Sequence, residues 1–134
     1  MSTPRYTIGI DLGTTHCALV SIDIGDSDGE RARQETLQVA QLAAPGSIES
    51  RPLLPSFVYL PHADELAAGD LNLPWTTQQN FAVGEFARTR GAATPIRLVS
   101  SAKSWLCHPG VDRRAAILPS DAPAEVARIS PLVA

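Results

Sequence analysis

An aspartate, a glycine and two threonines lie close together near the N-terminus of the chain. Gly13 permits a positive φ and puts no Cβ in the way of a ligand that approaches the backbone. Thr14 and Thr15 offer two hydroxyls beside a run of backbone N–H groups, and such a concavity suits phosphate oxygens. Asp11 is an acceptor-only carboxylate, the type of group that holds a hydrated Mg²⁺ near phosphates. These residue types at this spacing predict a phosphate-binding turn.

A β-hairpin is the element expected to present this turn, with one strand at Tyr6–Ile10 and a second at Cys17–Ile22. β-branched and apolar residues fill both segments, as half-buried strands require. His16 closes the turn, and its backbone N–H belongs to the same concavity. The same residue types also make ordinary hairpins, in which Asp and Gly supply only turn geometry. A Walker A loop is excluded, because its glycine and lysine spacing is absent and a strand follows the turn.

A second segment with functional potential is Arg97–Cys107, which the sequence predicts to be a helix. Lys103 lies at the border of its apolar face, about 40° beyond Val99 at roughly 100° per residue. A border lysine rests its stem on apolar surface and directs its ammonium group toward a neighbouring cleft. From the sequence alone, an ordinary surface lysine is the favoured interpretation. The apolar face has the spacing of a packed helix and consists of Leu98, Val99, Ala102, Trp105 and Leu106.

The segment Ile8–Thr15, followed directly by a second strand, resembles the first phosphate motif of the actin-like ATPase superfamily. Within that superfamily it is most similar to the 70-kilodalton heat-shock chaperone family. Two later segments, Val83–Gly91 and the predicted helix around Lys103, resemble the same family in the same order. The resemblance implies an α/β fold: a partial actin-like (ribonuclease H-like) ATPase lobe, whose mixed β-sheet opens with a β-hairpin and is flanked by helices.

The resemblance also implies ATP or ADP and Mg²⁺ as cofactors, with ATP hydrolysis as the activity. It places Asp11 near the hydrated Mg²⁺ and Lys103, as the catalytic residue, beside the γ-phosphate. A cation there offsets charge on the transferring phosphoryl group and orients the attacking water. The residues that it places around the β- and γ-phosphates are Gly13, Thr14, Thr15 and His16, the last through its backbone.

Residues 1–134 are expected to be the N-terminal portion of such an ATPase domain. The family's second phosphate loop, its adenosine-binding glycines and its peptide-binding domain have no counterpart in the sequence. The parent protein implied is an ATP-dependent molecular chaperone, with unfolded or extended peptides and co-chaperones as partners, whereas the 134-residue chain alone is expected to have negligible ATPase activity. Two alternatives share the first motif: a sugar or acetate kinase, and an actin-like scaffold that binds nucleotide.

Composition and charge argue against several classes of ligand and location. The net charge of −3 and the lack of a Lys/Arg stripe argue against nucleic acid as a ligand. No apolar run approaches the roughly 18 residues of a membrane span, and the N-terminus lacks the apolar core of a signal peptide. Cytoplasm is therefore the expected compartment. Cys17 and Cys107 do not have metal-site or disulfide-framework spacing, and Cys17 is expected to be a small buried residue.

The remaining elements are assigned from local pattern. Strands are predicted at Thr36–Leu42, for which a helix is the competing interpretation, and at Leu54–Leu60. Surface loops are predicted at Gly25–Arg33 and Ala44–Arg51, and an irregular stretch at Pro61–Asn80.

Near the other end, Phe81–Gly91 is predicted to be a strand end that turns into a short helix. Gly91 is expected to close that helix in the left-handed conformation. Ser130 is expected to start a further helix, because a proline follows it.

Overall fold

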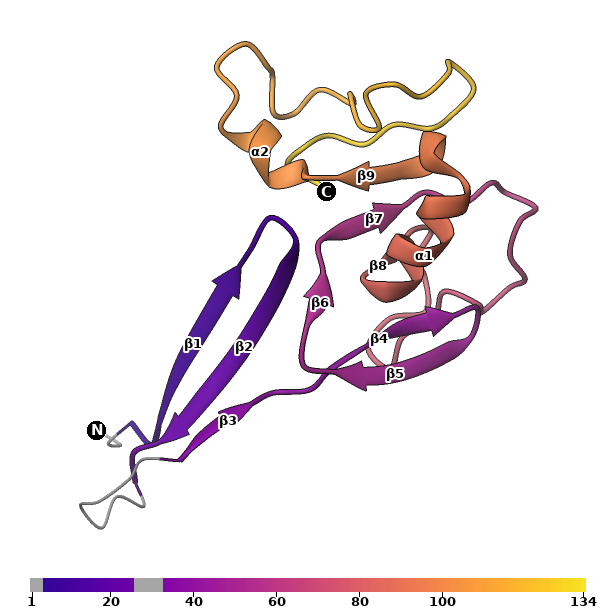
Figure 1. The fold of residues 1–134 in the computed structure, drawn as a ribbon. Helices are drawn as coiled ribbons and strands as arrows, with labels where there is room; N and C mark the ends of the chain where they lie inside the picture. The colour runs from indigo at the N-terminus through magenta and orange to yellow at the C-terminus, as the bar shows by residue number, and fades with distance from the viewer. Residues whose placement is uncertain (1–3, 26–32) are drawn as a thin grey trace.

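A computed structural model describes residues 4–25 and 33–134 as a mixed α/β structure with many short strands and few helices (Figure 1). The α/β class predicted from the sequence is confirmed at this level, and the actin-like lobe stays a prediction. Most of the predicted Gly25–Arg33 loop lies outside the described residues. Among the described residues, no helix is long and apolar enough to cross a membrane.

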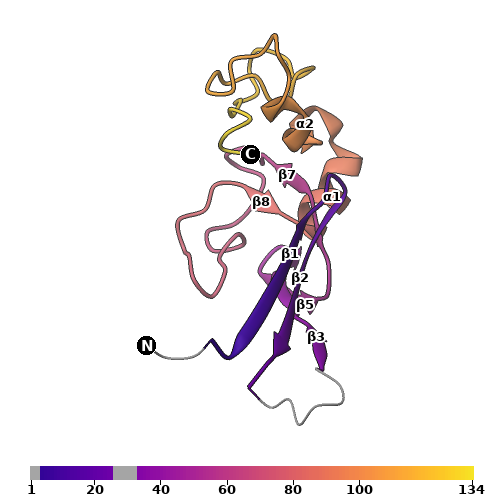
Figure 2. The same cartoon turned by 90° about the vertical axis from the view of Figure 1, so that its left-hand side faces the viewer.

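The predicted N-terminal hairpin is present. β1 (Tyr6–Leu12) pairs antiparallel with β2 (His16–Asp23), with Gly9 opposite Val20. The other edge of β2 pairs with β3 (Gln34–Thr36) and with β6 (Leu54–Pro55). β1 is therefore an edge strand of this sheet. Figures 1 and 2 show the hairpin reaching from the N-terminal end of the molecule toward α2.

Two smaller sheets follow. β4 (Val39–Ala44) and β5 (Ser47–Arg51) form a hairpin, while β7 (Phe57–Tyr59) lies between β8 (Ala82–Val83) and β9 (Leu98–Ser100). Every named strand pair in the described residues is antiparallel, so the mixed sheet implied by the resemblance is not observed there. For the hairpins β1–β2 and β4–β5 the reason is the short turn between the strands, because parallel neighbours need a long crossover.

Three predictions about strands and loops need correction. The predicted strand Thr36–Leu42 is divided between β3 and β4, and Leu54–Leu60 is divided between β6 and β7 at Ser56. The predicted loop Ala44–Arg51 is wrong, because only its proline and glycine form a turn and β5 follows. Gly46 has φ +66° in that turn, a conformation that glycine adopts without strain. The irregular character of Pro61–Asn80 is confirmed.

α1 (Glu85–Ala93) packs against β7 and β4 around the first core cluster. The Tyr59 and Phe86 rings meet edge to face in this cluster, with centroids 6.5 Å apart. The expected left-handed closure at Gly91 is wrong, since the helix continues to Ala93 and Gly91 is buried inside it. A Cβ at Gly91 would lie 2.3 Å from Leu98 Cδ1, so the glycine is needed for close packing of the helix on β9.

The irregular stretch is attached to α1 by an ion pair. Glu65 accepts a hydrogen bond of 2.8 Å from the Tyr59 hydroxyl and one of 2.6 Å from Arg90 Nε. Tyr59 is fully buried, and burial, followed by the hydrogen bond to Glu65, raises its pKa.

The predicted helix Arg97–Cys107 is wrong over its first half. The chain forms a 3₁₀ turn, η1 (Pro95–Arg97), then β9, and only then α2 (Ala102–Leu106). Val99 pairs with Val58 and is 2% exposed, so cross-strand pairing and burial override the helical spacing. Ser101, at φ +54°, makes the bend between β9 and α2.

The C-terminal region has little regular structure. Leu118 and Ile129 form an isolated antiparallel bridge that closes the second core cluster, built on Val58 and Val99. Ser130 begins a single turn, in which Val133 N and Ala134 N donate to Ser130 O, and the helix expected from Ser130 stays a prediction because only four residues follow it.

Candidate functional site

The tip of the N-terminal hairpin meets α2. Lys103 Nζ donates a hydrogen bond of 2.5 Å to the backbone carbonyl of Leu12, although the two residues are 91 positions apart in the sequence. A cavity of about 360 Å³ lies at this junction, and its lining includes Leu12, Gly13, Thr14 and Lys103. The fold therefore brings the predicted phosphate turn and the predicted catalytic lysine into one place.

The rest of this cavity is apolar. β7, β8, β9 and α2 contribute its walls, with side chains that include Phe57, Val83, Val99 and Leu106. Such walls cannot replace the water around a charged phosphate, since an uncompensated charge in apolar surroundings is strongly disfavoured. An anion at this site therefore belongs at the hairpin tip, where the turn and the ammonium group lie, and not in the cavity interior.

The turn itself carries unpaired donors. Among the residues that the structure describes, the backbone N–H groups of Thr14 and Thr15 donate to no protein acceptor. Thr14 and Thr15 are exposed, so their hydroxyls and N–H groups are open to a ligand. These groups fit a phosphate chemically, because it is an anion with several acceptor oxygens.

Gly13 is required at the turn for a steric reason. It does not have the positive φ that the sequence suggested. A Cβ at this position would lie 2.3 Å from the backbone oxygen of His16, a distance that real contacts do not reach. Any side chain would therefore force the two ends of the turn apart.

Ser56 is a site residue that the sequence analysis missed. Its hydroxyl donates a hydrogen bond of 2.8 Å to Gly13 O, and its backbone N–H donates one of 2.9 Å to Thr15 O. Two carbonyls of the turn are thereby engaged from the β6–β7 bend, and Lys103 engages a third, that of Leu12. The signal available in the sequence was a serine directly after a proline in a predicted strand, which does not by itself indicate such a contact.

The Cys17 thiol lies beside this serine, with Sγ 3.6 Å from Ser56 Oγ. It is half-buried and lines the cavity, so it is less buried than the sequence analysis expected. The cause is its position at the hairpin tip, next to the cavity mouth.

The other predicted site residues lie nearby but outside the cavity lining. Asp11 is exposed on β1 opposite Ala18, and strand alternation directs its side chain to the face opposite that of Leu12. His16 begins β2 and is in register with Pro55. Within residues 4–25 and 33–134, no group of three His, Cys, Asp or Glu side chains is placed to hold a metal. A single carboxylate still fits Mg²⁺, which keeps several waters and binds substrate phosphates directly.

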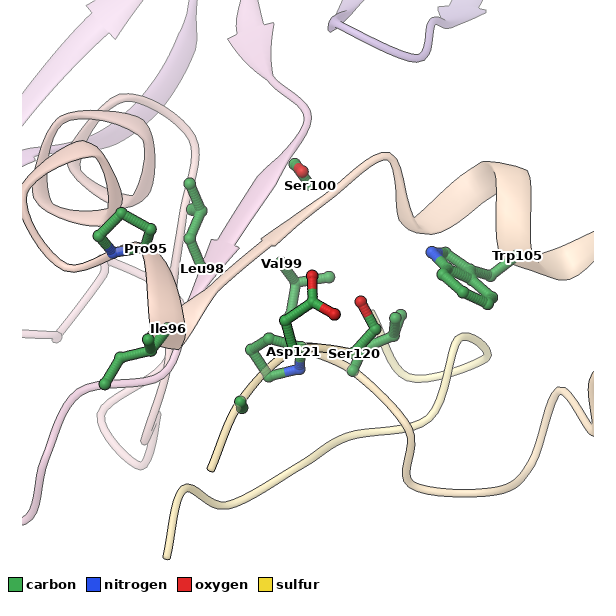
Figure 3. Close-up of a pocket in the computed structure, with 11 residues that line it drawn as sticks. Pro95, Ile96, Leu98, Val99, Ser100, Trp105, Ser120 and Asp121 are labelled. Carbon is green, nitrogen blue, oxygen red and sulfur yellow. The ribbon is translucent and has the colours of Figure 1, made fainter. Parts of the chain in front are cut away.

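A separate cavity of about 310 Å³ lies between β9, α2 and residues 118–122. Figure 3 shows Trp105, Ser120 and Asp121 around it. None of the residues predicted to bind phosphate, Mg²⁺ or nucleotide lines this cavity.

Comparison with known proteins finds no family model, no curated protein and no solved structure that matches this chain.

Proposed function

We propose that the chain is the phosphate-binding portion of an ATP-hydrolysing molecular chaperone with an actin-like ATPase domain. One observation carries the proposal: a hydrogen bond joins Lys103 to the hairpin tip, beside a turn with unpaired donors. The family resemblance requires Lys103 to lie close to the hairpin tip. The local sequence of either segment does not determine that closeness.

Each residue then has a defined task. Thr14 and Thr15 donate hydrogen bonds from N–H and hydroxyl groups to the β- and γ-phosphates of ATP or ADP. Lys103 supplies positive charge beside the γ-phosphate. Asp11 holds the hydrated Mg²⁺ through water, and the ion neutralises phosphate charge when bound.

The site described is one wall of a nucleotide pocket. Lys103, predicted to contact the γ-phosphate, and Asp11, predicted to hold Mg²⁺, are both exposed. Water is therefore not excluded from the hairpin tip. Catalysis of phosphoryl transfer needs positioned groups in a water-excluded site. The 134-residue chain is therefore expected to bind nucleotide weakly and to hydrolyse it negligibly, while peptide clients and co-chaperones are partners of the parent chaperone.

Calorimetric titration of the chain with Mg²⁺–ATP tests the proposal. Lys103→Ala should weaken binding about tenfold or more, since a hydrogen bond to a charged group contributes about 1.5 to 3 kcal/mol. Arg114→Ala is the matched control, because it removes one exposed cation away from the hairpin tip and should bind as the unmodified chain does. Absence of nucleotide binding by the unmodified chain, or equal affinities for both variants, would refute the proposal.

A second readout uses the fact that Lys103 is the only lysine of the chain. Reductive methylation followed by mass spectrometry reports on this ammonium group and the α-amino group alone. Mg²⁺–ATP should slow methylation of Lys103 and leave the α-amino group unaffected. Measurable ATP turnover by the chain, abolished by Lys103→Ala, would show that the expected lack of hydrolysis is wrong.

A further inference from the structure

The cavity of about 310 Å³ between β9, α2 and residues 118–122 has a lining unlike that of the hairpin tip. Its floor is apolar, because Val99 and Leu118 are each 2% exposed and belong to the second core cluster. The half-buried indole ring of Trp105 forms one side. The antiparallel bridge from Leu118 to Ile129 holds the opposite side against the core. The hollow is therefore formed by packing within this chain.

Among the described residues that line this cavity, Asp121 alone carries a charge. Figure 3 shows its carboxylate and the Ser120 hydroxyl directed toward β9. In the part of the chain that the structure describes, the Asp121 carboxylate forms no ion pair and accepts no hydrogen bond. The Arg128 guanidinium lies close in sequence, but it donates to the Ala122 carbonyl and does not line the cavity. A negative charge without a cation partner therefore faces the hollow.

The strand β9 adds a backbone acceptor at the same place. Leu98, Val99 and Ser100 all line the cavity, although successive residues of a strand point to opposite faces, so the cavity lies along the edge of β9. Leu60 N donates to Arg97 O, and because hydrogen-bonded pairs alternate along the ladder, Val99 bonds to β7. The Leu98 carbonyl is therefore directed away from β7, to the edge along which the cavity lies.

We propose that this cavity binds a small primary amine in its ammonium form, at a site separate from the proposed nucleotide site. An ammonium group has three donors and no acceptor. The Asp121 carboxylate, the Ser120 hydroxyl and the Leu98 carbonyl supply acceptors for these donors. The apolar part of the amine lies against Val99 and Trp105, and the indole ring also attracts the cation.

The same lining disfavours other classes of ligand. An anion would meet the Asp121 carboxylate without a compensating positive charge. A divalent metal ion prefers several oxygen ligands, and within residues 4–25 and 33–134 no group of three His, Cys, Asp or Glu side chains is placed to hold one. A neutral molecule would leave the carboxylate without a counter-charge. A volume of about 310 Å³ is at the lower end of the range for ligand pockets, so the amine is small.

An NMR titration of the isotope-labelled chain with phenethylamine tests the site. The chain has two tryptophans, and Trp75 is 65% exposed and lies outside the cavity. Phenethylamine should shift the indole N–H signal of Trp105 and leave that of Trp75 in place, with Trp75→Phe assigning the two signals. Phenethyl alcohol keeps the ring and lacks the charge, so it should bind about fivefold more weakly. Absence of a shift at Trp105, or equal affinities for the amine and the alcohol, would overturn the proposal.

Asp121→Asn tests the role of the carboxylate. It should weaken phenethylamine binding about fivefold and leave the affinity for phenethyl alcohol unchanged. Asp64→Asn is the matched control, because it removes the same charge from an exposed aspartate outside the cavity. Equal affinities of the two variants for phenethylamine would overturn the proposal. Mg²⁺–ATP should bind both variants equally, so this outcome is distinct from failure of the nucleotide site.

A lysine side chain carries the same ammonium group, so Nα-acetyl-lysine methylamide is the second ligand of the titration. Weaker binding of this compound than of phenethylamine would support a free amine as the ligand. Tighter binding would overturn that assignment in favour of a lysine side chain of a peptide.

Discussion

Removal of the Ser56 hydroxyl is the perturbation that tests most directly how the hairpin tip is held. Ser56→Ala removes the 2.8 Å hydrogen bond from the Ser56 hydroxyl to Gly13 O and the contact of that hydroxyl with the Cys17 thiol. It leaves the hydrogen bond from Ser56 N to Thr15 O in place. The substitution adds no atoms, so it creates no clash. Any effect is therefore due to the missing hydroxyl.

The expected loss of stability follows from the burial of this contact. A half-buried hydrogen bond contributes about 0.5 to 1.5 kcal/mol, and the Gly13 carbonyl left without a partner adds to the cost. We expect the free energy of unfolding to fall by about 1 to 2 kcal/mol. For a domain of this size, that corresponds to a decrease in Tm of about 4 to 8 °C.

Thermal unfolding followed by circular dichroism measures this effect, with Ser50→Ala as the matched control. Ser50 is exposed on β5, and its loss should change stability by less than about 0.5 kcal/mol. Amide exchange gives a local readout, because Thr14 and Thr15 should change their exchange rates in Ser56→Ala and not in Ser50→Ala. Equal Tm values and unchanged exchange at the turn would refute the idea that Ser56 holds it.

Two further predictions concern the core and the ion pair. Gln41, 2% exposed, accepts a 2.9 Å hydrogen bond from Glu85 N at the start of α1 and donates to a backbone carbonyl, so Gln41→Met should lower the free energy of unfolding by about 2 to 4 kcal/mol in urea denaturation. Burial opposes ionisation of Glu65, but the His62 N–H and the Arg90 guanidinium outweigh it and hold the Glu65 pKa below its usual range. Glu65 therefore stabilises the fold above the ordinary carboxyl pKa of about 4.3, and this contribution is lost as pH falls through the lower folded value. Glu65→Gln should flatten the acid limb of a plot of Tm against pH; an unchanged limb would contradict this.

Local sequence was sufficient for the hairpin and for α1. β-branched and apolar residues on both sides of a glycine-containing turn favour two paired strands, which is what β1 and β2 form. The helix after Gly84 follows from its own residues, although its N-terminus is held by Gln41 from another strand. The sequence also identified Lys103 and the turn as candidates, through residue type and the family resemblance.

Only the tertiary structure decided where those candidates lie. Val99 and its neighbours have helical spacing, yet β9 forms because β7 offers a ladder and a buried position, and burial outweighs local propensity. That strand places α2 so that Lys103 reaches Leu12 O, and the break between β6 and β7 places Ser56 under the turn. Contacts of this kind join residues tens of positions apart, and their free energy comes from burial and hydrogen bonding that local pattern does not encode. The residue types of the site were therefore legible in the sequence, whereas their meeting point depended on packing.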